Sequence, residues 1–578
     1  MAAKATISDE EWAKAEGVPS QSDPFIQKYL AGRDALVEQE KKQRSDRLFR
    51  ANLSPMAAEA CSIVDQIRFE EQQTLWTKEY EDSLESEYVD IFPGMMFSIA
   101  RERITKSKLW KIIQKMPKGA LLHCHLEAMV DVDWALGEAF ATEGVCVRSD
   151  VPLSSPQALT KGKFSFTYSK TRAKDDVSIW SDAYTSETPV PINAAADSFA
   201  EGGRKGFVEW IHSRVAITAE EHLKHHEGPN EVWRKFMSCF PVLGSLIYYE
   251  PIYRKFIRRL LKQLLDDGVY YVDLRSAFYT PYRPLGQEEF DPDYLNMLDH
   301  LEDEIEKFKA SDEGKDFWGA RMIWTTVRAF DKRKVIESMK QCIEMKLEFP
   351  ELIAGFDLVG QEDLGRPLSD LAPELFYFRK ASAEAGVDIP FFFHAGETLG
   401  DGDSVDENLF DAIILGTRRI GHGFSLYKHP LLIDMVKERR ILVESCPVSN
   451  EVLRLCGSIK SHPLPALLAR GVPCSLCNDD PTILGQGLAT SMSFDFWQAL
   501  QGWDNLGLAG LGSLAENSVR WASFEDYSAK EWTQDIKDGT FGKGTRAKRL
   551  KEWIAKWERY CAWIVDEFGV DENLEPEE

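Results

Sequence analysis

The stretch GALLHCHLEAM, residues 119–129, decides the fold. It is a short apolar run that ends in polar residues, and the same pattern recurs along the chain. The other runs are VYYVDLRSAF (269–278), ARMIWTTVRAF (320–330), LIAGFDLVG (352–360), IPFFFHAGE (389–397), RRIGHG (418–423), ILVESCPVS (441–449) and PCSLCNDD (473–480). Continuous apolar runs are typical of strands buried on both faces, as in a parallel sheet.

Amphipathic helical stretches alternate with these runs. KRKVIESMKQCIEMKLE follows the third run and PLSDLAPELFYFRKASAEAG follows the fourth, each with apolar residues three and four positions apart. Eight strands that alternate with helices predict an α/β fold, a (β/α)8 TIM barrel.

The barrel leaves parts of the 578 residues unexplained. Residues 25 to about 87 have helical periodicity throughout, so residues 1–105 are predicted to form an N-terminal helical extension. The barrel is predicted over 106–540. Residues 130–268 separate its first two strands, where a helix with its loops needs roughly 30 residues. This excess predicts an insertion at about 141–205, either a small subdomain or a partly ordered lobe, and 541–578 form a C-terminal helix and acidic tail.

Composition excludes several classes of partner. The formal net charge is −25, from 69 basic and 94 acidic residues, which argues against nucleic acid or an anionic membrane. No apolar run is long enough to span a bilayer. MAAKATISDEEWAKAEG at the start lacks the pattern of a secretory signal, so we predict a cytoplasmic protein, with export by an unconventional route left open. The 10 cysteines, among them Cys474 and Cys477, are predicted to be reduced, buried thiols.

Chemically competent residues gather at the ends of the predicted strands. The first strand ends in His123-Cys124-His125, and residues two apart on a strand point to the same side. Active sites of such barrels lie at the C-terminal ends of the strands. His394, His422 and Asp479 follow later strands, so all these side chains are expected on one rim. Each alone has an ordinary structural interpretation, but the coincidence favours a metal site.

The ligand types indicate which metal binds. Imidazole nitrogens with one carboxylate suit Zn²⁺, with iron, nickel or cobalt as lesser options. The predicted ligands are His123, His125, His394 and Asp479. Glu397, three residues past His394, is placed to transfer a proton, and His422 to accept a proton from water or to orient it. The set predicts hydrolytic attack on a polarised carbon.

The motifs MPKGALLHCHLE, HAGET, RIGHG and NDDP resemble those of the adenosine and AMP deaminases among the metal-dependent amidohydrolases. The resemblance covers most of residues 116–500. The segment from VWRKFMSCFPVLGSL to VYYVDLR, the motif ESCPVSNEVL and the helical extension resemble the adenosine deaminase-related growth factor subgroup. Members of that subgroup are typically secreted and carry disulfides, whereas this chain shows no signal, which argues against an extracellular signalling role.

The resemblance implies a role for each remaining residue of the rim, and one Zn²⁺ per chain on the four ligands already named. Glu397 matches the acid that protonates purine N1, and His422 the base that orients the attacking water. Asp480 matches the carboxyl that bonds N7, Gly360 the backbone donor to N3, and Glu127 the acidic residue near the ribose 5′-hydroxyl. The implied reaction is attack of activated water on C6, a tetrahedral intermediate and loss of ammonia.

The substrate depends largely on Glu127. A carboxylate near the 5′ position accepts a bond from a hydroxyl but repels a phosphate by about 1 to 4 kcal/mol. We therefore expect adenosine rather than AMP, although Lys161, Lys163 or Arg172 in the insertion could reach a phosphate.

Two other functions stay open at this stage. One is a silent adenosine-binding or signalling protein, and the other is an enzyme that deaminates adenine or a modified adenine. The resembling subgroup also implies a homodimer formed through the N-terminal helices, with a cap over the chain's own barrel as the alternative.

Overall fold

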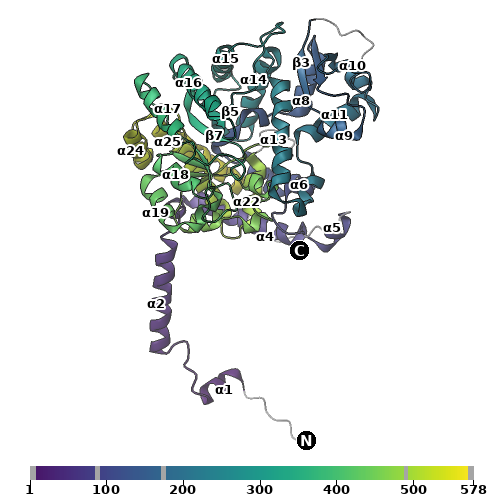
Figure 1. Cartoon of the computed structure of the whole chain (residues 1–578). Coiled ribbons are helices and arrows are strands. Elements are labelled where there is room, and N and C mark those ends of the chain that lie inside the picture. The colour runs from purple at the N-terminus through teal and green to yellow at the C-terminus, as the bar shows by residue number, and fades with distance from the viewer. Residues whose placement is uncertain (1–7, 85–90, 171–177, 487–491, 570–578) are drawn as a thin grey trace.

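The computed structural model describes residues 8–84, 91–170, 178–486 and 492–569. Its centre is a ring of parallel strands (Figure 1). These are β1 (Gly119–His125), β5 (Val269–Ala277), β6 (Gly319–Val327), β7 (Ile353–Val359), β8 (His394–Ala395), β9 (Arg419–His422), β10 (Leu442–Ser445) and β11 (Cys474–Leu476).

The ring closes through two isolated bridges. The strands form the sheets β1-β5-β6-β7 and β11-β10-β9-β8. Cys124 pairs with Asp479 at one junction, and Phe356 pairs with Phe391 at the other. All eight predicted strands are therefore present, and the predicted (β/α)8 barrel is confirmed.

Helices surround the barrel and bury the outer faces of its strands. The helix that follows β6 begins where the side chain of Asp331 accepts the backbone N–H of Lys334, which caps its first turn. These helices are α14 (Glu250–Asp266), α15 (Leu295–Ala310), α16 (Lys332–Glu348), α17 (Ala372–Glu384), α18 (Asn408–Ile414), α19 (Pro430–Arg439), α20 (Pro447–Val452), α21 (Leu464–Ala469), α22 (Met492–Gly502), α23 (Gly507–Arg520) and α24 (Ala529–Asp538).

The long connection after β1 contains a small lobe of its own. It includes a three-stranded antiparallel sheet in the order β3-β2-β4, in which Val147 pairs with Phe166. Trp180, Phe207 and Trp210 pack together beside this sheet. The elements are α8 (Val132–Ala141), β2 (Val145–Ser149), α9 (Pro156–Lys161), β3 (Phe164–Tyr168), β4 (Val190–Pro191), α10 (Ile192–Asp197), α11 (Gly203–Val215), α12 (Ala219–Leu223) and α13 (Gly228–Ile247).

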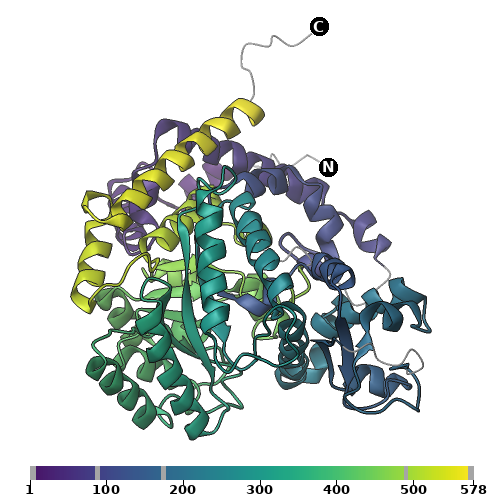
Figure 2. The same ribbon diagram turned by 90° about the horizontal axis from the view of Figure 1, so that it is seen from above.

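The N-terminal extension has two parts. The helices α1 (Asp9–Ala15) and α2 (Pro24–Lys41) project away from the body (Figure 1). The remaining helices pack on the barrel, and α4 lies beside the C-terminal helix α25 (Figure 2). The packed helices of the extension are α3 (Arg47–Ala51), α4 (Pro55–Thr74), α5 (Lys78–Ser83) and α6 (Phe97–Thr105). The next helix, α7 (Lys108–Lys115), precedes β1, and α25 spans Thr545–Phe568.

Two smaller predictions can be compared with the structure. All ten cysteines are free thiols, and Cys474 and Cys477 are both buried, as predicted. Among the described residues, no helix is both long and apolar enough to cross a membrane.

Candidate metal and catalytic site

A cavity opens at the C-terminal ends of the barrel strands. One wall is apolar and is formed by α13, which contributes Trp233, Phe236, Met237 and Phe240. The floor is polar and carries the side chains predicted from sequence. These are His125, Glu127, Gly360, His394, Glu397, His422, Asp479 and Asp480.

The four predicted metal ligands lie together at the base of this cavity. One side-chain nitrogen or oxygen from each of them lies within 4.8 Å of those of the others. His123 and His125 come from β1, where the two-residue spacing turns both side chains inward. The β8 strand contributes His394, and the turn after β11 contributes Asp479, which has a positive φ of +57°.

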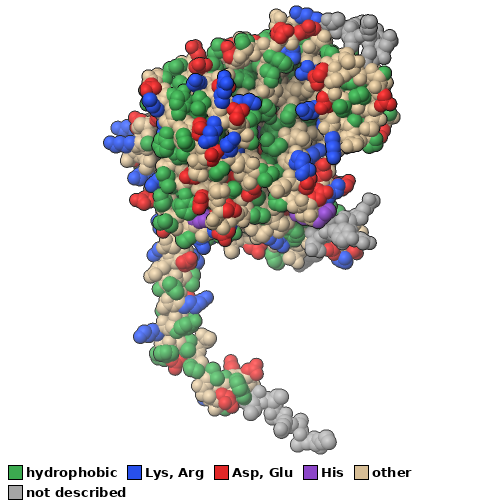
Figure 3. Space-filling view, in the orientation of Figure 1, with side chains coloured by type: hydrophobic (Ala, Val, Ile, Leu, Met, Phe, Trp, Pro, Cys, Tyr) green, Lys and Arg blue, Asp and Glu red, His purple; other side chains and the backbone are tan. Residues whose placement is uncertain are grey.

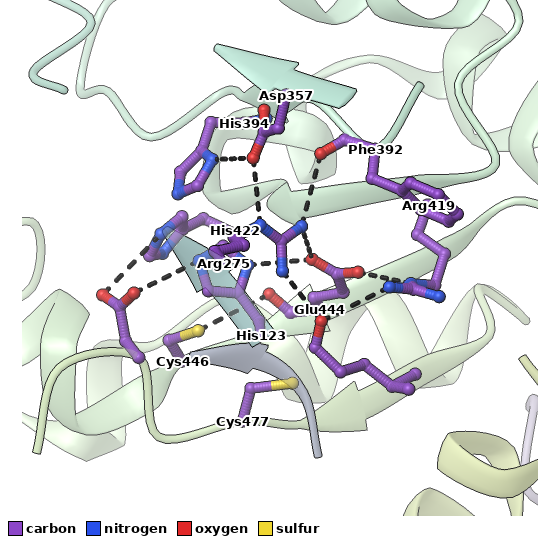
Figure 4. A network of polar contacts seen from close by, with 12 residues as sticks. His123, Arg275, Asp357, Phe392, His394, Arg419, His422, Glu444, Cys446 and Cys477 are labelled. Atoms are coloured by element: carbon purple, nitrogen blue, oxygen red, sulfur yellow. Dashed lines mark hydrogen bonds and ion pairs between the residues drawn. The ribbon is translucent and has the colours of Figure 1, made fainter. Parts of the chain in front are cut away.

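Two buried carboxylates fix the protonation of the ligating imidazoles (Figure 4). His123 donates from Nδ1 to Glu444 (2.8 Å), and His394 donates from Nδ1 to Asp357 (2.6 Å). The carboxylates of Glu444 and Asp357 have pKa values held well below the usual range: burial opposes ionisation, but nearby cationic groups outweigh it. Because an ionised carboxylate only accepts, each Nδ1 must carry a proton, and in the neutral ring that binds a metal Nε2 is then left with the lone pair.

The facing atoms of His123 and Asp479 fit a cation bound between them. Nε2 of His123 lies 3.2 Å from Oδ1 of Asp479, and neither atom has a hydrogen-bond partner. Both atoms are acceptors and both residues are buried, so they would repel each other unless a positive charge lay between them. Three imidazoles and one carboxylate are a donor set that suits Zn²⁺. The residues present therefore fit the predicted metal.

A second grouping of possible ligands consists of His123, His422, Cys446 and Asp479. It shares two members with the first grouping. The two sets differ in how far they are open to the cavity, because His125, His394 and Asp479 of the first set line it, whereas only His422 and Asp479 of the second set do. The first grouping therefore faces the substrate.

Glu397 points into the cavity from the loop after β8. It is 3% exposed, and its Oε1 has no hydrogen-bond partner. Burial, together with the negative charge of Asp479, raises the pKa of this carboxyl well above its usual value. Both effects favour the protonated form of this side chain, which can donate a proton.

A chain of hydrogen bonds sets the tautomer of His422. The backbone N–H of Leu464 donates to Nδ1 of His462, so Nε2 of His462 carries the proton and donates to Oδ1 of Asn450 (3.0 Å). The amide nitrogen of Asn450 then donates to Nδ1 of His422 (3.2 Å). Burial lowers the pKa of His422, which keeps the ring neutral. Its proton is therefore on Nε2, which faces Asp479 at 3.9 Å.

The three remaining predicted residues also line the cavity. Burial and the charge of Asp479 raise the pKa of Asp480, which favours its protonated form. Gly360 adopts a φ of +99°, a conformation that favours glycine. Glu127 accepts hydrogen bonds from Tyr248 (2.6 Å) and Ser276 (2.9 Å), both at Oε1.

Sequence reasoning missed the residues that support this site. Asp357 and Glu444 orient the ligands, and the guanidinium of Arg275 lies between these two carboxylates, 3.0 and 2.8 Å from them. Both acids interrupt otherwise apolar strand sequences, GFDLV and LVES. A charged residue inside a strand that is buried on both faces must find a buried partner, and this signal could have identified them.

Comparison with known proteins supports the fold of the chain and then shows its family. The zinc-bound structure of an amidohydrolase from Burkholderia ambifaria has a similar fold, with a TM-score of 0.50 and 17% identity over 79% of this chain and 95% of that chain. A family model described as adenosine deaminase matches residues 215–538. The chain belongs to the adenosine deaminase family, as the motif resemblance indicated.

Relatives with known names match most of the chain. Adenosine deaminase 2-A of Danio rerio is 32% identical over 444 residues, which are 76% of this chain and 82% of that protein. Adenosine deaminase 2 of Homo sapiens is 31% identical over 77% of this chain and 83% of its own length. Adenosine deaminase 2 of Dictyostelium discoideum is 26% identical over 96% of this chain and 90% of its own length.

Proposed function

We propose that the protein deaminates adenosine to inosine and ammonia with one Zn²⁺ per chain, held by His123, His125, His394 and Asp479. The facing lone pairs of His123 and Asp479 carry this proposal. When bound, the ion supplies a Lewis acid that lowers the pKa of water toward neutrality.

The polar groups of the cavity match the acceptors of an adenine ring. N1, N3 and N7 of adenine all accept hydrogen bonds, so a complementary site needs three donors. The protonated side chain of Glu397 donates to N1, which makes C6 more electrophilic, and the protonated side chain of Asp480 donates to N7. The backbone N–H of Gly360 is the proposed donor to N3.

His422 is proposed to orient the attacking water. Its neutral ring carries the proton on Nε2, so it can donate a hydrogen bond to the oxygen of the attacking nucleophile and fix its position toward C6. Of the two roles that the sequence left open, the hydrogen-bond chain supports orientation rather than proton acceptance in the free protein.

The charge of the cavity favours a nucleoside over a nucleotide. Among the described residues that line it there is no lysine or arginine, and Glu127 accepts hydrogen bonds from Tyr248 and Ser276. Both partners bond Oε1 of Glu127, so the other oxygen can accept a ribose 5′-hydroxyl. A phosphate there would be buried without a cation, which is costly. Lys161 and Lys163 do not line the cavity, and Arg172 lies outside the described residues.

Glu127→Gln is expected to lower kcat/KM for adenosine by about tenfold, since a hydrogen bond to a charged group contributes roughly 1.5 kcal/mol or more. The same change removes the repulsion of a phosphate, so the ratio of adenosine to AMP activity should narrow. Steady-state rates on both substrates measure this. If the variant has unchanged kinetics on both, Glu127 does not face the 5′ position.

We further propose that the projecting helices form a homodimer contact. α1 and α2 carry large apolar side chains in water, such as Trp12 (56% exposed), Phe25 (77%) and Leu36 (68%) (Figure 3). No other described part of the chain buries them. A second copy of the chain that pairs the same two helices would cover these apolar side chains. The helices that pack on the chain's own barrel are α3 to α7, so α1 and α2 do not form that cap.

Deletion of residues 1–41 is expected to convert a dimer into a monomer that keeps its fold. The cut falls before Asp46, which bonds Arg44 and Arg50, and before Ala57, Ala60 and Val64, which are buried on the body. Sedimentation equilibrium of the full and shortened chains measures the change. A shortened chain that stays dimeric would place the contact elsewhere, and a full-length chain that sediments as a monomer would refute the dimer.

A further inference from the structure

A buried glutamate that the proposed mechanism does not use lies behind Glu397. Glu362 follows β7 and is 1% exposed. Its carboxylate reaches the neighbouring loop, where Oε1 accepts the backbone N–H of Glu397 (2.9 Å) and Oε2 accepts that of Gly396 (3.3 Å). One side chain thus binds two consecutive peptide groups, the second of which belongs to the proposed acid.

Glu362 is itself held in place from two sides. The amide of Asn408, at the start of α18, donates to Oε2 (2.7 Å), and its carbonyl accepts the backbone N–H of Leu368 (2.7 Å). Nη1 of Arg328 lies 3.8 Å from the same carboxylate, and its Nη2 donates to the backbone carbonyl of His394 (3.0 Å). Asn408 and Arg328 are fully buried, so both supporting side chains are shielded from solvent.

The turn that Glu362 binds has little other freedom. Gly396 has a φ of +77°, and a β-carbon there would lie 2.9 Å from the side chains of Leu409 and Ser425. Gly396 thus permits the turn, and the carboxylate of Glu362 fixes the orientation of the Glu397 backbone and side chain within it. Hydrogen bonds to an ionised acceptor are stronger than neutral ones, and an orphaned buried N–H is costly, so loss of the carboxylate would release the turn.

We infer that Glu362 is a positioning residue that aims the side chain of Glu397 at N1 of the substrate ring. This inference rests on the proposed role of Glu397 as the acid. Catalysis is sensitive to displacement, because a shift of about 1 Å in a reacting group can cost roughly 10²-fold in rate. Glu362 does not line the cavity, so it acts through Glu397 and not on the substrate.

The test compares Glu362→Gln with Asp363→Asn. Glutamine keeps the shape but presents an N–H group to backbone N–H donors. Asp363 is a matched control on the same loop, because it accepts the hydroxyl of Thr398 (2.6 Å) and does not bond Glu397. Glu362→Gln should lower kcat for adenosine by about 30-fold, with KM and zinc content within about threefold of wild type. Asp363→Asn should stay within about threefold in every quantity.

Ligand binding separates positioning from a general loss of structure. A stable nucleoside with a hydroxyl-bearing tetrahedral carbon in place of C6 uses the contact at N1, whereas 1-deazaadenosine has no nitrogen there. Glu362→Gln should weaken binding of the first compound by about tenfold or more and leave binding of the second unchanged. When Glu397→Gln is already present, adding Glu362→Gln should not weaken binding of the first compound any further.

Several results would overturn the inference. The inference fails if kcat is unchanged in Glu362→Gln, or if Asp363→Asn lowers kcat as much. It also fails if Glu362→Gln weakens binding of both ligands by the same factor. It fails too if, in the Glu397→Gln background, Glu362→Gln still weakens binding of the first compound by its full factor. If Glu362→Gln does not fold, Asn408→Ser is the second variant, because it removes one support of the same carboxylate. It should lower kcat by about threefold and weaken binding of the first compound but not of the second. An unchanged kcat in Asn408→Ser would then refute the inference. An unchanged kcat in Glu397→Gln would instead refute the proposed function.

Discussion

Glu397→Gln is expected to lower kcat for adenosine by about 10³-fold, because the amide cannot transfer a proton to N1 in the transition state and general acid catalysis contributes roughly 10²- to 10⁴-fold. The side chain keeps its size, so the zinc content should not change. The pKa of Glu397 is raised by burial and by Asp479, which is the condition for a carboxyl to act as an acid at neutral pH. Stopped-flow absorbance at saturating adenosine measures the loss.

A matched control for this variant is Glu451→Gln. Glu451 is also buried, its pKa is raised to about 8 by burial, and it bonds Gln498 away from the cavity. This control should retain kcat within about threefold. Similar losses in both variants would mean that replacing any buried carboxyl in this barrel disturbs catalysis, and Glu397 would lose its special role.

Asp357→Asn is expected to weaken zinc binding by about 10- to 100-fold, the usual effect of removing the partner of a ligating imidazole. The amide of asparagine can donate to Nδ1 of His394, and the ring proton then moves to Nε2 and blocks the nitrogen that faces the metal. Competition with a chromophoric chelator measures the zinc affinity. Activity should be recovered in part when excess zinc is added.

Asp273→Asn is the control for the loss of a buried charge. Asp273 lies inside the same barrel and pairs with Arg419 at 2.9 Å, but it bonds none of the four proposed ligands. It should lower the free energy of unfolding without changing zinc affinity. Asp357→Asn with wild-type zinc affinity would show that the carboxylate does not set the tautomer of His394.

The fold was predictable because each barrel strand is encoded locally. The run IPFFFHAGE was predicted as a strand, and the structure retains only His394–Ala395 as regular strand there. Its apolar residues still lie in the barrel wall, where the N–H of Phe392 donates to the carbonyl of Phe356. The rim residues were predictable for the same reason, since barrel geometry brings all strand ends to one face.

The supporting network was not predictable, because its partners are distant in sequence. Glu444 bonds His123 across 321 positions, and the pairing exists only once the barrel closes. The sequence also did not show that α1 and α2 project while the later helices of the extension pack on the barrel, and the reason is similar. The same helical periodicity runs through α2 and α4, and only the packing of α4 on α25 shows which part is covered.

The measurement that tests the central claim most directly is adenosine deamination by the full chain before and after metal removal. The protein is dialysed against a chelator, its zinc is quantified, and turnover is followed by absorbance as zinc is restored. We predict that the metal-free protein is almost inactive and that activity rises in proportion to bound zinc, up to one ion per chain. Full activity in the metal-free protein, or no turnover of adenosine with one zinc bound, would contradict the account.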